Sequence, residues 1–124
     1  MFAVQENKMK IAHADQSDKG WYFGPWNSDL KVSVGYANKG IDEPHVHSQI
    51  TEIYLVARGT AKIRVEQKTI ELQSGDMITI EPGEAHTFLS SSIDYFHFVI
   101  HTPGISGDTA KSEKLAVERT RLRL

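Results

Sequence analysis

Alternating hydrophobic and polar positions begin at Leu30 and characterise the middle of the chain. Residues 30–36 alternate with a period of two, and residues 61–66 do so without interruption. A period of two places the apolar side chains on one face of a strand and the polar side chains on the other. Both segments are therefore predicted to be half-buried β-strands.

Similar short segments recur as far as residue 101, and turn-forming residues separate them. Glycine, proline, asparagine, aspartate and serine cluster between the segments, as they do in tight turns. No helical pattern long enough to connect parallel strands lies between them, which favours an antiparallel sandwich or barrel. The predicted fold class is all-β, with further strands at 53–57, 69–72, 77–80, 86–89 and 95–101.

The two ends of the chain are less regular than its middle. Residues 1–28 are predicted to form an irregular N-terminal arm that holds a short strand at its aromatic residues. The tail, residues 103–124, leaves two alternatives open: a short helix from Lys111, or an alternating strand from Val117 onward. Such a strand could lie on the surface or be exchanged between protomers. A chain of 124 residues fits one domain, 1–124, with its barrel core at about 29–102.

The composition of the chain excludes several classes of partner and of metal ligand. The 14 Lys and Arg residues balance 16 Asp and Glu residues, so no basic bias points to nucleic acid. No apolar run approaches the roughly 18 residues that a membrane span needs, and the first residues lack signal-peptide features. We therefore expect a cytoplasmic protein without nucleic-acid or membrane partners. Cysteine is absent, so any metal ion must be bound by histidine and carboxylate side chains.

Two short segments bring such ligands together. His45 and His47 are two residues apart, which places both side chains on one face of a strand, about 6–7 Å apart along it. Glu52 lies an odd number of residues after His47, so a bend in the polar stretch 48–51 must return its carboxylate to the same side. Tyr54 should then share the face of Glu52.

The second segment, residues 75–86, reads as a strand that enters a Pro-Gly turn and returns to present His86. Three imidazoles and one carboxylate form a mixed nitrogen and oxygen site, which suits a first-row divalent ion. Four protein ligands on a six-coordinate ion leave two positions for water or substrate, as a reactive site requires.

These residues match two motifs of one family. In the first motif, a glycine, a His-x-His pair, a glutamate and a hairpin glycine correspond to Gly40, His45, His47, Glu52 and Gly59. In the second motif, Gly-Asp followed by Pro-Gly-x-x-His corresponds to Gly75, Asp76, Pro82, Gly83 and His86. Over residues 40–90 the chain resembles a small, single-domain member of the cupin superfamily (cupin 2 type). It departs from the family pattern at Glu81, where many members have proline, and at Ser90, where the older form of the motif has asparagine.

The resemblance implies a double-stranded β-helix, or jelly-roll, barrel. It also implies one divalent transition metal ion bound by His45, His47, Glu52 and His86. Histidine and carboxylate ligands serve Fe, Mn, Ni, Co, Cu and Zn alike, so the sequence selects none of them.

For two groups of side chains near the motifs, the sequence leaves two positions in the fold possible. His97 and His101 alternate with Phe96, Phe98 and Ile100, and we favour the interpretation in which the apolar residues face the core and the histidines face outward. The reverse orientation would place His97 inside the barrel as an acid or base. Four aromatic residues of the arm either close one mouth of the barrel or pack against a sheet: Trp21, Tyr22, Phe23 and Trp26.

Three functions remain possible for such a barrel. The first is a metalloenzyme for a small oxygen-rich substrate, of the dioxygenase or the sugar or keto-acid isomerase and lyase type, with Glu52 and Tyr54 as candidate catalytic residues. The second is a module that binds or senses a small ligand without catalysis. The third is a structural dimerising unit, which the complete ligand set counts against. We favour the enzyme and expect a homodimer, because the barrel would leave apolar outer sheet faces.

Overall fold

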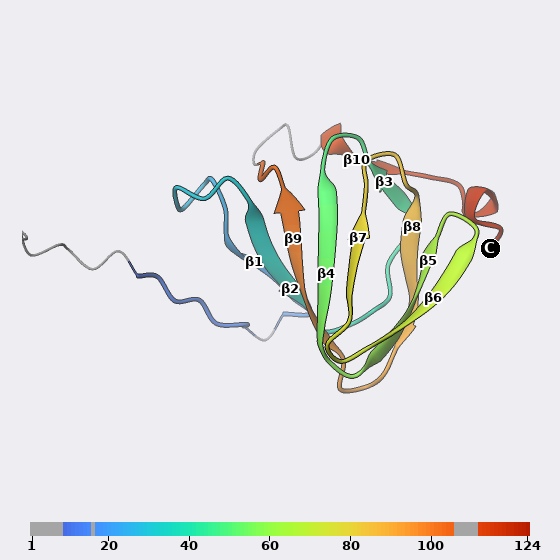
Figure 1. Ribbon diagram of the computed structural model, residues 1–124, viewed down its shortest axis with the longest axis horizontal. Coiled ribbons are helices and arrows are strands. Elements are labelled where there is room, and N and C mark those ends of the chain that lie inside the picture. The colour runs from blue at the N-terminus through green and yellow to red at the C-terminus, as the bar shows by residue number, and fades with distance from the viewer. Residues whose placement is uncertain (1–8, 16, 106–111) are drawn as a thin grey trace, which may run out of the picture.

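The computed structural model describes residues 9–15, 17–105 and 112–124. Two five-stranded antiparallel sheets face each other and enclose the core (Figure 1). Along one sheet the strand order is β1-β2-β9-β4-β7, and along the other it is β10-β3-β8-β5-β6. The strands are β1 (Lys19–Phe23), β2 (Ser33–Ala37), β3 (His45–His47), β4 (Thr51–Arg58), β5 (Thr60–Val65), β6 (Lys68–Gln73), β7 (Met77–Ile80), β8 (His86–Ser91), β9 (Phe96–Thr102) and β10 (Lys114–Ala116).

The all-β prediction is confirmed, and each predicted strand lies within a few residues of an observed one. In β5, buried Ala61 and Ile63 alternate with exposed Thr60 and Lys62, as the period of two requires. No helix in the described part of the chain is long and apolar enough to cross a membrane. The inward-facing side chains of both sheets form the core, whose buried members are Tyr54, Val56, Ala61, Ile63, Leu72, Ile80, Phe88, Tyr95 and Val99.

The chain changes sheets between β3 and β4, at residues 48–50. This crossing is the bend that the odd spacing between His47 and Glu52 predicted. As a result, His45 and His47 project from one sheet towards Glu52 on the other. Tyr54 shares the inward face of β4 with Glu52, as predicted. Val56 lies on the same face, and both side chains are buried.

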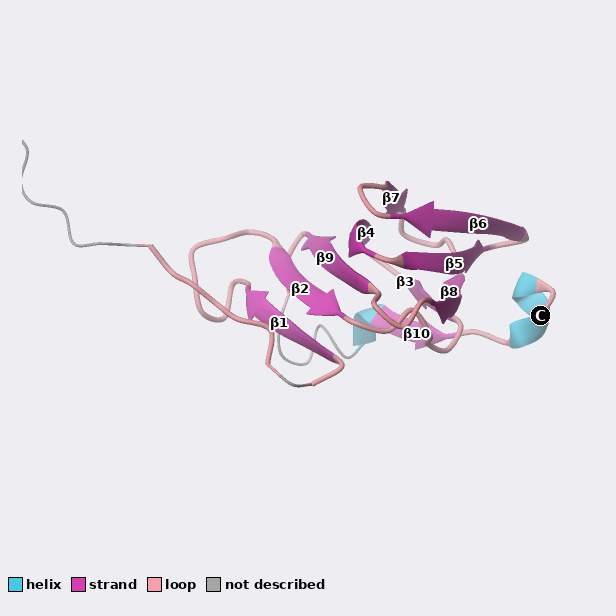
Figure 2. Cartoon of the chain, turned by 90° about the horizontal axis from the view of Figure 1, so that it is seen from below, coloured by secondary structure: helices cyan, strands magenta, loops and turns pink. Residues whose placement is uncertain are grey.

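The ends of the chain agree with the predictions only in part. The aromatic part of the arm forms β1, which pairs with β2, whereas residues 9–15 carry no strand and extend away from the barrel (Figure 2). The tail follows neither alternative as a whole: Lys111 lies outside the described residues, and residues 112 and 113 are helical, but the chain is a strand from Lys114. The tail forms β10, which pairs with β3 of the same chain, and then a short 3-10 helix at Arg119–Leu122. The predicted strand from Val117 is absent from this described segment, because buried Leu122 packs from a helical turn instead.

Candidate metal centre

The four predicted ligands come from three strands that meet at one end of the barrel. β3 turns both His45 and His47 inward, where each side chain is 4% exposed. In the neighbouring strand β8, His86 lies directly opposite His45 and is fully buried. Glu52, near the start of β4, faces them from the other sheet and is 3% exposed.

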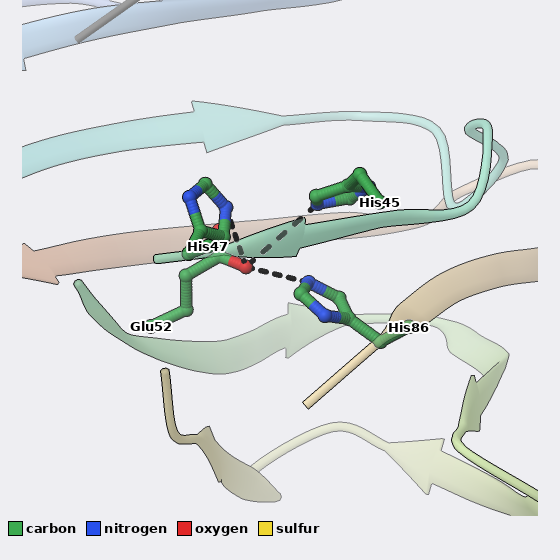
Figure 3. Close-up of side chains that lie close together, drawn as sticks. All are labelled: His45, His47, Glu52 and His86. Carbon is green, nitrogen blue, oxygen red and sulfur yellow. Dashed lines mark hydrogen bonds and ion pairs between the residues drawn. The ribbon is translucent and has the colours of Figure 1, made fainter. Parts of the chain in front are cut away.

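The imidazoles of these three histidines surround one carboxylate oxygen (Figure 3). Glu52 Oε1 lies 2.6 Å from His86 Nε2, 3.2 Å from His47 Nε2 and 3.9 Å from His45 Nε2. One ligand atom from each of the four residues lies within 4.8 Å of every other. The structure therefore brings together all four residues that the motifs predicted.

The other ring nitrogen of each histidine is already engaged. His45 Nδ1 donates to the carbonyl oxygen of Glu43 at 2.8 Å, and His86 Nδ1 donates to that of Glu84 at 3.0 Å. His47 Nδ1 donates to the carboxylate of Glu113 at 2.6 Å. All three partners are acceptors, so each ring keeps a proton on Nδ1. Its Nε2 then presents a lone pair when the ring is neutral and an N–H group to Glu52 when the ring is charged.

This arrangement fits a metal cation. Three Nε2 lone pairs and a carboxylate oxygen converge on one buried point, where they repel each other unless a positive charge lies between them. Neutral imidazole nitrogen and carboxylate oxygen are ligands that first-row divalent metals accept. The four residues could therefore bind one such ion, with the Nδ1 hydrogen bonds holding each ring in its ligating orientation.

The protonation states agree with this role. Burial favours the neutral acid of Glu52, but hydrogen bonds from His101, His47 and His86 outweigh it and hold the pKa of Glu52 well below its ordinary value. For His45, burial and then the charge of His86 lower the pKa to about 4. Burial also opposes charging of His47, yet its bonds to Glu52 and Glu113 raise its pKa. Without a metal ion, a proton on His47 offsets part of the negative charge.

The second oxygen of Glu52 is held by two further side chains. Tyr54 donates its hydroxyl to Glu52 Oε2 at 3.0 Å, and His101 Nε2 lies 2.7 Å from the same oxygen. Burial, reinforced by the charge of Glu52, raises the pKa of Tyr54 well above its ordinary value, so its hydroxyl stays protonated as a donor. Tyr54 therefore reaches the site through Glu52.

The favoured orientation of His97 and His101 was wrong. In the β4–β9 pairing, His101 lies opposite Glu52 and His97 lies opposite buried Val56, so both histidines face inward. Phe96, Phe98 and Ile100 instead face outward, where Phe96 stacks on Tyr36 and Phe98 packs near Tyr22, whereas Val99 faces the core with the histidines. Alternation had fixed which residues share a face, but not which face is inside.

Inside the barrel, His97 is a neutral side chain with a defined partner. The hydroxyl of Tyr95 lies 2.7 Å from His97 Nδ1, and the ring of Phe88 stacks against the imidazole at 5.2 Å between centroids. Burial lowers the pKa of His97 to about 4, against the opposing charge of Glu52. At neutral pH the ring is therefore uncharged.

A cavity of about 760 Å³ opens above the four-residue cluster. His45, His47 and Glu52 line it, while His86 is buried beneath. Trp21 and Trp26 line the cavity as half-exposed side chains, and the Trp21 ring packs 4.8 Å from His101. Two of the four arm aromatics thus border the cavity, whereas the other two, Tyr22 and Phe23, do not line it.

Sequence reasoning missed three residues around the site. Glu113 lies in the tail, where no motif marks it, and only the docking of β10 on β3 brings it to His47. His101 was assigned to the wrong face. Ser33 lines the cavity from β2, and its hydroxyl is buried without a hydrogen-bond partner in the described structure. None of the three has a local sequence signal that distinguishes it from an ordinary strand or tail residue.

Comparison with known proteins places the chain in a family. Residues 31–115 match the family model of the AraC-like ligand binding domain, which covers more than half of the chain. No curated protein matches the chain by sequence.

Solved structures with the same fold include three informative neighbours. KdgF from Halomonas sp. has a TM-score of 0.61 at 16% identity, over 74% of this chain and 81% of KdgF. Streptomyces Pac13, described as a nucleoside dehydratase, has a TM-score of 0.63 at 10% identity, over 94% of this chain and all of Pac13. A cupin-2 domain protein from Shewanella frigidimarina has a TM-score of 0.52 at 24% identity, over 56% of this chain and 69% of that protein. The chain therefore belongs to the AraC-like ligand binding domain family and, with its jelly-roll barrel, to the cupin superfamily.

Proposed function

We propose that the chain is a metal-dependent enzyme for a small, oxygen-rich substrate, of the dioxygenase or the sugar or keto-acid isomerase and lyase type. The observation that supports this most strongly is the set of three imidazoles with engaged Nδ1 atoms, whose Nε2 atoms meet Glu52 beneath a cavity. Four ligands leave up to two positions of an octahedral ion for substrate oxygen atoms.

The bound metal ion would supply Lewis acidity that polarises a substrate carbonyl or stabilises an enolate. Glu52 is ionised, and if a substrate displaces it from the metal its carboxylate can accept a proton as a general base. Tyr54 and His101 orient that carboxylate through Oε2. His101 also lines the cavity, so it can exchange a proton between Glu52 and a ligand there.

The cavity walls support a ligand with several oxygen atoms and an anionic group. The Ser33 hydroxyl, which has no hydrogen-bond partner among the described residues, faces the cavity from one sheet. Lys19 and Lys114 also line it, and no ion pair joins either ammonium to another described residue. Trp21 and Trp26 add flat apolar surface near the mouth. A volume of about 760 Å³ lies in the range of cavities for small-molecule ligands.

The alternative function is non-catalytic binding or sensing of such a ligand. The match to the AraC-like ligand binding domain favours it, because that family is named for ligand binding. The same cluster and cavity would then capture the ligand without converting it.

The experiment compares turnover with binding. Metal-loaded protein is incubated with panels of sugars, uronates, keto acids and diketones, and products are followed by NMR and oxygen uptake. Enzyme activity predicts a product that disappears in Glu52→Gln but persists in Glu71→Gln, a matched change at a carboxylate on β6, outside the cavity. Ligand-dependent thermal stabilisation without product would favour the sensing function. Neither product nor stabilisation with any panel would contradict the proposal.

A further inference from the structure

Glu113 is a buried carboxylate that the tail inserts beside the metal centre. It is 3% exposed and lies 66 residues after His47 in the sequence. Besides the 2.6 Å contact with His47 Nδ1, its other oxygen accepts the backbone N–H groups of Gln49 and Ile50, each at 3.1 Å. Its side-chain partners thus lie in the segment that carries the chain from β3 across to Glu52.

Among the three candidate histidine ligands, His47 alone depends on a distant segment for its orientation. His45 and His86 donate Nδ1–H to carbonyl oxygens two residues upstream, within their own segments. His47 donates to a side chain that reaches it only when the tail is docked on β3. A carboxylate partner orients a ligating imidazole and raises its basicity more than a carbonyl does.

The docked tail is also fixed by contacts that do not involve the ligand side chains. The N–H of Ser48 donates to the carbonyl oxygen of Glu113 at 3.0 Å, and the N–H of Val117 donates to that of Pro44 at 3.2 Å. Further along, Arg64 donates to the carbonyl oxygen of Leu122 at 2.8 Å, and the Leu122 side chain is fully buried.

We propose that Glu113 is a positioning residue of the metal centre, and that metal binding and docking of residues 112–124 stabilise each other. This inference rests on the proposed metal-dependent function. A docked tail presents Glu113 to His47 and so strengthens metal binding. By thermodynamic reciprocity, a bound metal ion must then raise the equilibrium constant for docking of the tail by the same factor.

The docked tail also supplies part of the cavity wall. Lys114 pairs with His47 across the β10–β3 ladder, and directly paired residues project to the same face of a sheet. Lys114 accordingly lines the cavity that His47 lines. Release of the tail would therefore remove both the partner of a ligand and one cation from the cavity mouth.

The first test measures Co²⁺ affinity, and the d–d absorption of Co²⁺ reports its ligand geometry. Glu113→Gln removes the charge and one acceptor at nearly constant volume, so the Kd for Co²⁺ should rise about 10- to 100-fold with an altered spectrum. The control is Glu71→Gln, the same change at a carboxylate on β6 outside the cavity and the tail, and its Kd should stay within about threefold of wild type. Equal affinity in Glu113→Gln and wild type would overturn the inference. An equal loss in Glu71→Gln would also overturn it, because the loss would then not depend on the contact between Glu113 and His47.

The second test needs no variant. Amide hydrogen exchange of the wild-type chain is compared with and without Co²⁺ at the N–H groups of Ser48 and Val117, which bond across the docked tail. Exchange should slow about tenfold or more when Co²⁺ binds, and unchanged exchange in the Co²⁺-bound protein would overturn the proposed linkage. If the wild-type chain binds no Co²⁺, the metal-dependent function fails and this inference fails with it. If the wild-type chain binds Co²⁺ tightly, but Glu113→Gln does not change the Kd and Co²⁺ does not slow exchange at the tail, only this inference is refuted.

Discussion

The pKa values of two buried histidines in this barrel shift in opposite directions, and the surroundings of each side chain explain the direction. His47 has two carboxylates as partners, and its pKa is raised. His97 has a phenol and aromatic rings around it, and burial lowers its pKa to about 4. The same residue type therefore takes up a proton more readily beside two carboxylates than among aromatic rings.

The low pKa of His97 predicts acid sensitivity of the metal-free protein. Between about pH 6.5 and pH 4, the unfolded chain binds a proton at residue 97 that the folded chain does not. The free energy of unfolding therefore falls as pH drops through this window, by about 2 kcal/mol between pH 7 and pH 5 from this residue alone. Urea denaturation at both pH values should show a smaller drop in His97→Asn. An equal drop in wild type and variant would contradict the assignment.

At the residue scale, the sequence predicts the candidate metal ligands better than the residues that hydrogen-bond to those ligands. His45, His47, Glu52 and His86 are recognisable because motif spacing ties them to a strand, a bend and a Pro-Gly turn. The orientation of His101 depends on which side of β9 the aromatic residues of β1 and β2 cover, and alternation within β9 carries no such information. Glu113 depends on the docking of a tail whose local pattern indicated a different structure.

At the scale of elements, tight glycine turns connect consecutive strands that lie in different sheets. β4 and β5 are joined through Gly59 alone, whose φ of 79° lies in the left-handed region that favours glycine. Gly75, between β6 and β7, has a φ of 91°. Strand positions were predictable because these turns separate alternating segments, whereas the change of sheet after β3 was visible only as an odd spacing.

The two turn glycines predict a graded loss of stability. Gly75→Ala should cost about 1 kcal/mol from backbone strain, since nothing lies within 4 Å of the added Cβ. Gly59→Ala should cost at least about 1 kcal/mol more, because its Cβ would also lie 2.9 Å from Tyr95 Cα and crowd Ser92 and Asp94. Chemical denaturation of both variants measures the difference. An equal loss of unfolding free energy in both variants would contradict this prediction, because crowding at the β4–β5 turn would then cost nothing.

At the scale of the whole molecule, one sheet carries an apolar outer face. The partly exposed rings of Tyr22, Phe96 and Phe98 pack there over buried Tyr36, and partly exposed Leu55 lies opposite Phe98 on β4. Contiguous apolar surface of this kind is typical of protein–protein interfaces. This face supports the expected homodimer, whereas the tail pairs with its own barrel.

The dimer prediction is tested by sedimentation. Wild-type protein should sediment at about twice the 13.9 kDa chain mass, and Leu55→Glu should shift it to the monomer, because burying an unpaired charge in the interface is unfavourable. Ile93→Glu, at a fully exposed position between β8 and β9, is the matched control and should remain dimeric. A monomeric wild-type chain at tens of micromolar would contradict the prediction.

The central claim is that His45, His47, Glu52 and His86 bind a metal ion, and metal content tests it most directly. Protein purified without chelators or nickel affinity steps is analysed by mass spectrometry beside His86→Ala and the control His13→Ala, which changes an exposed histidine of the arm. We predict about one first-row transition metal ion per wild-type chain, retained in His13→Ala and lost in His86→Ala. A wild-type chain that holds no metal, even after reconstitution with each candidate ion, would contradict the account.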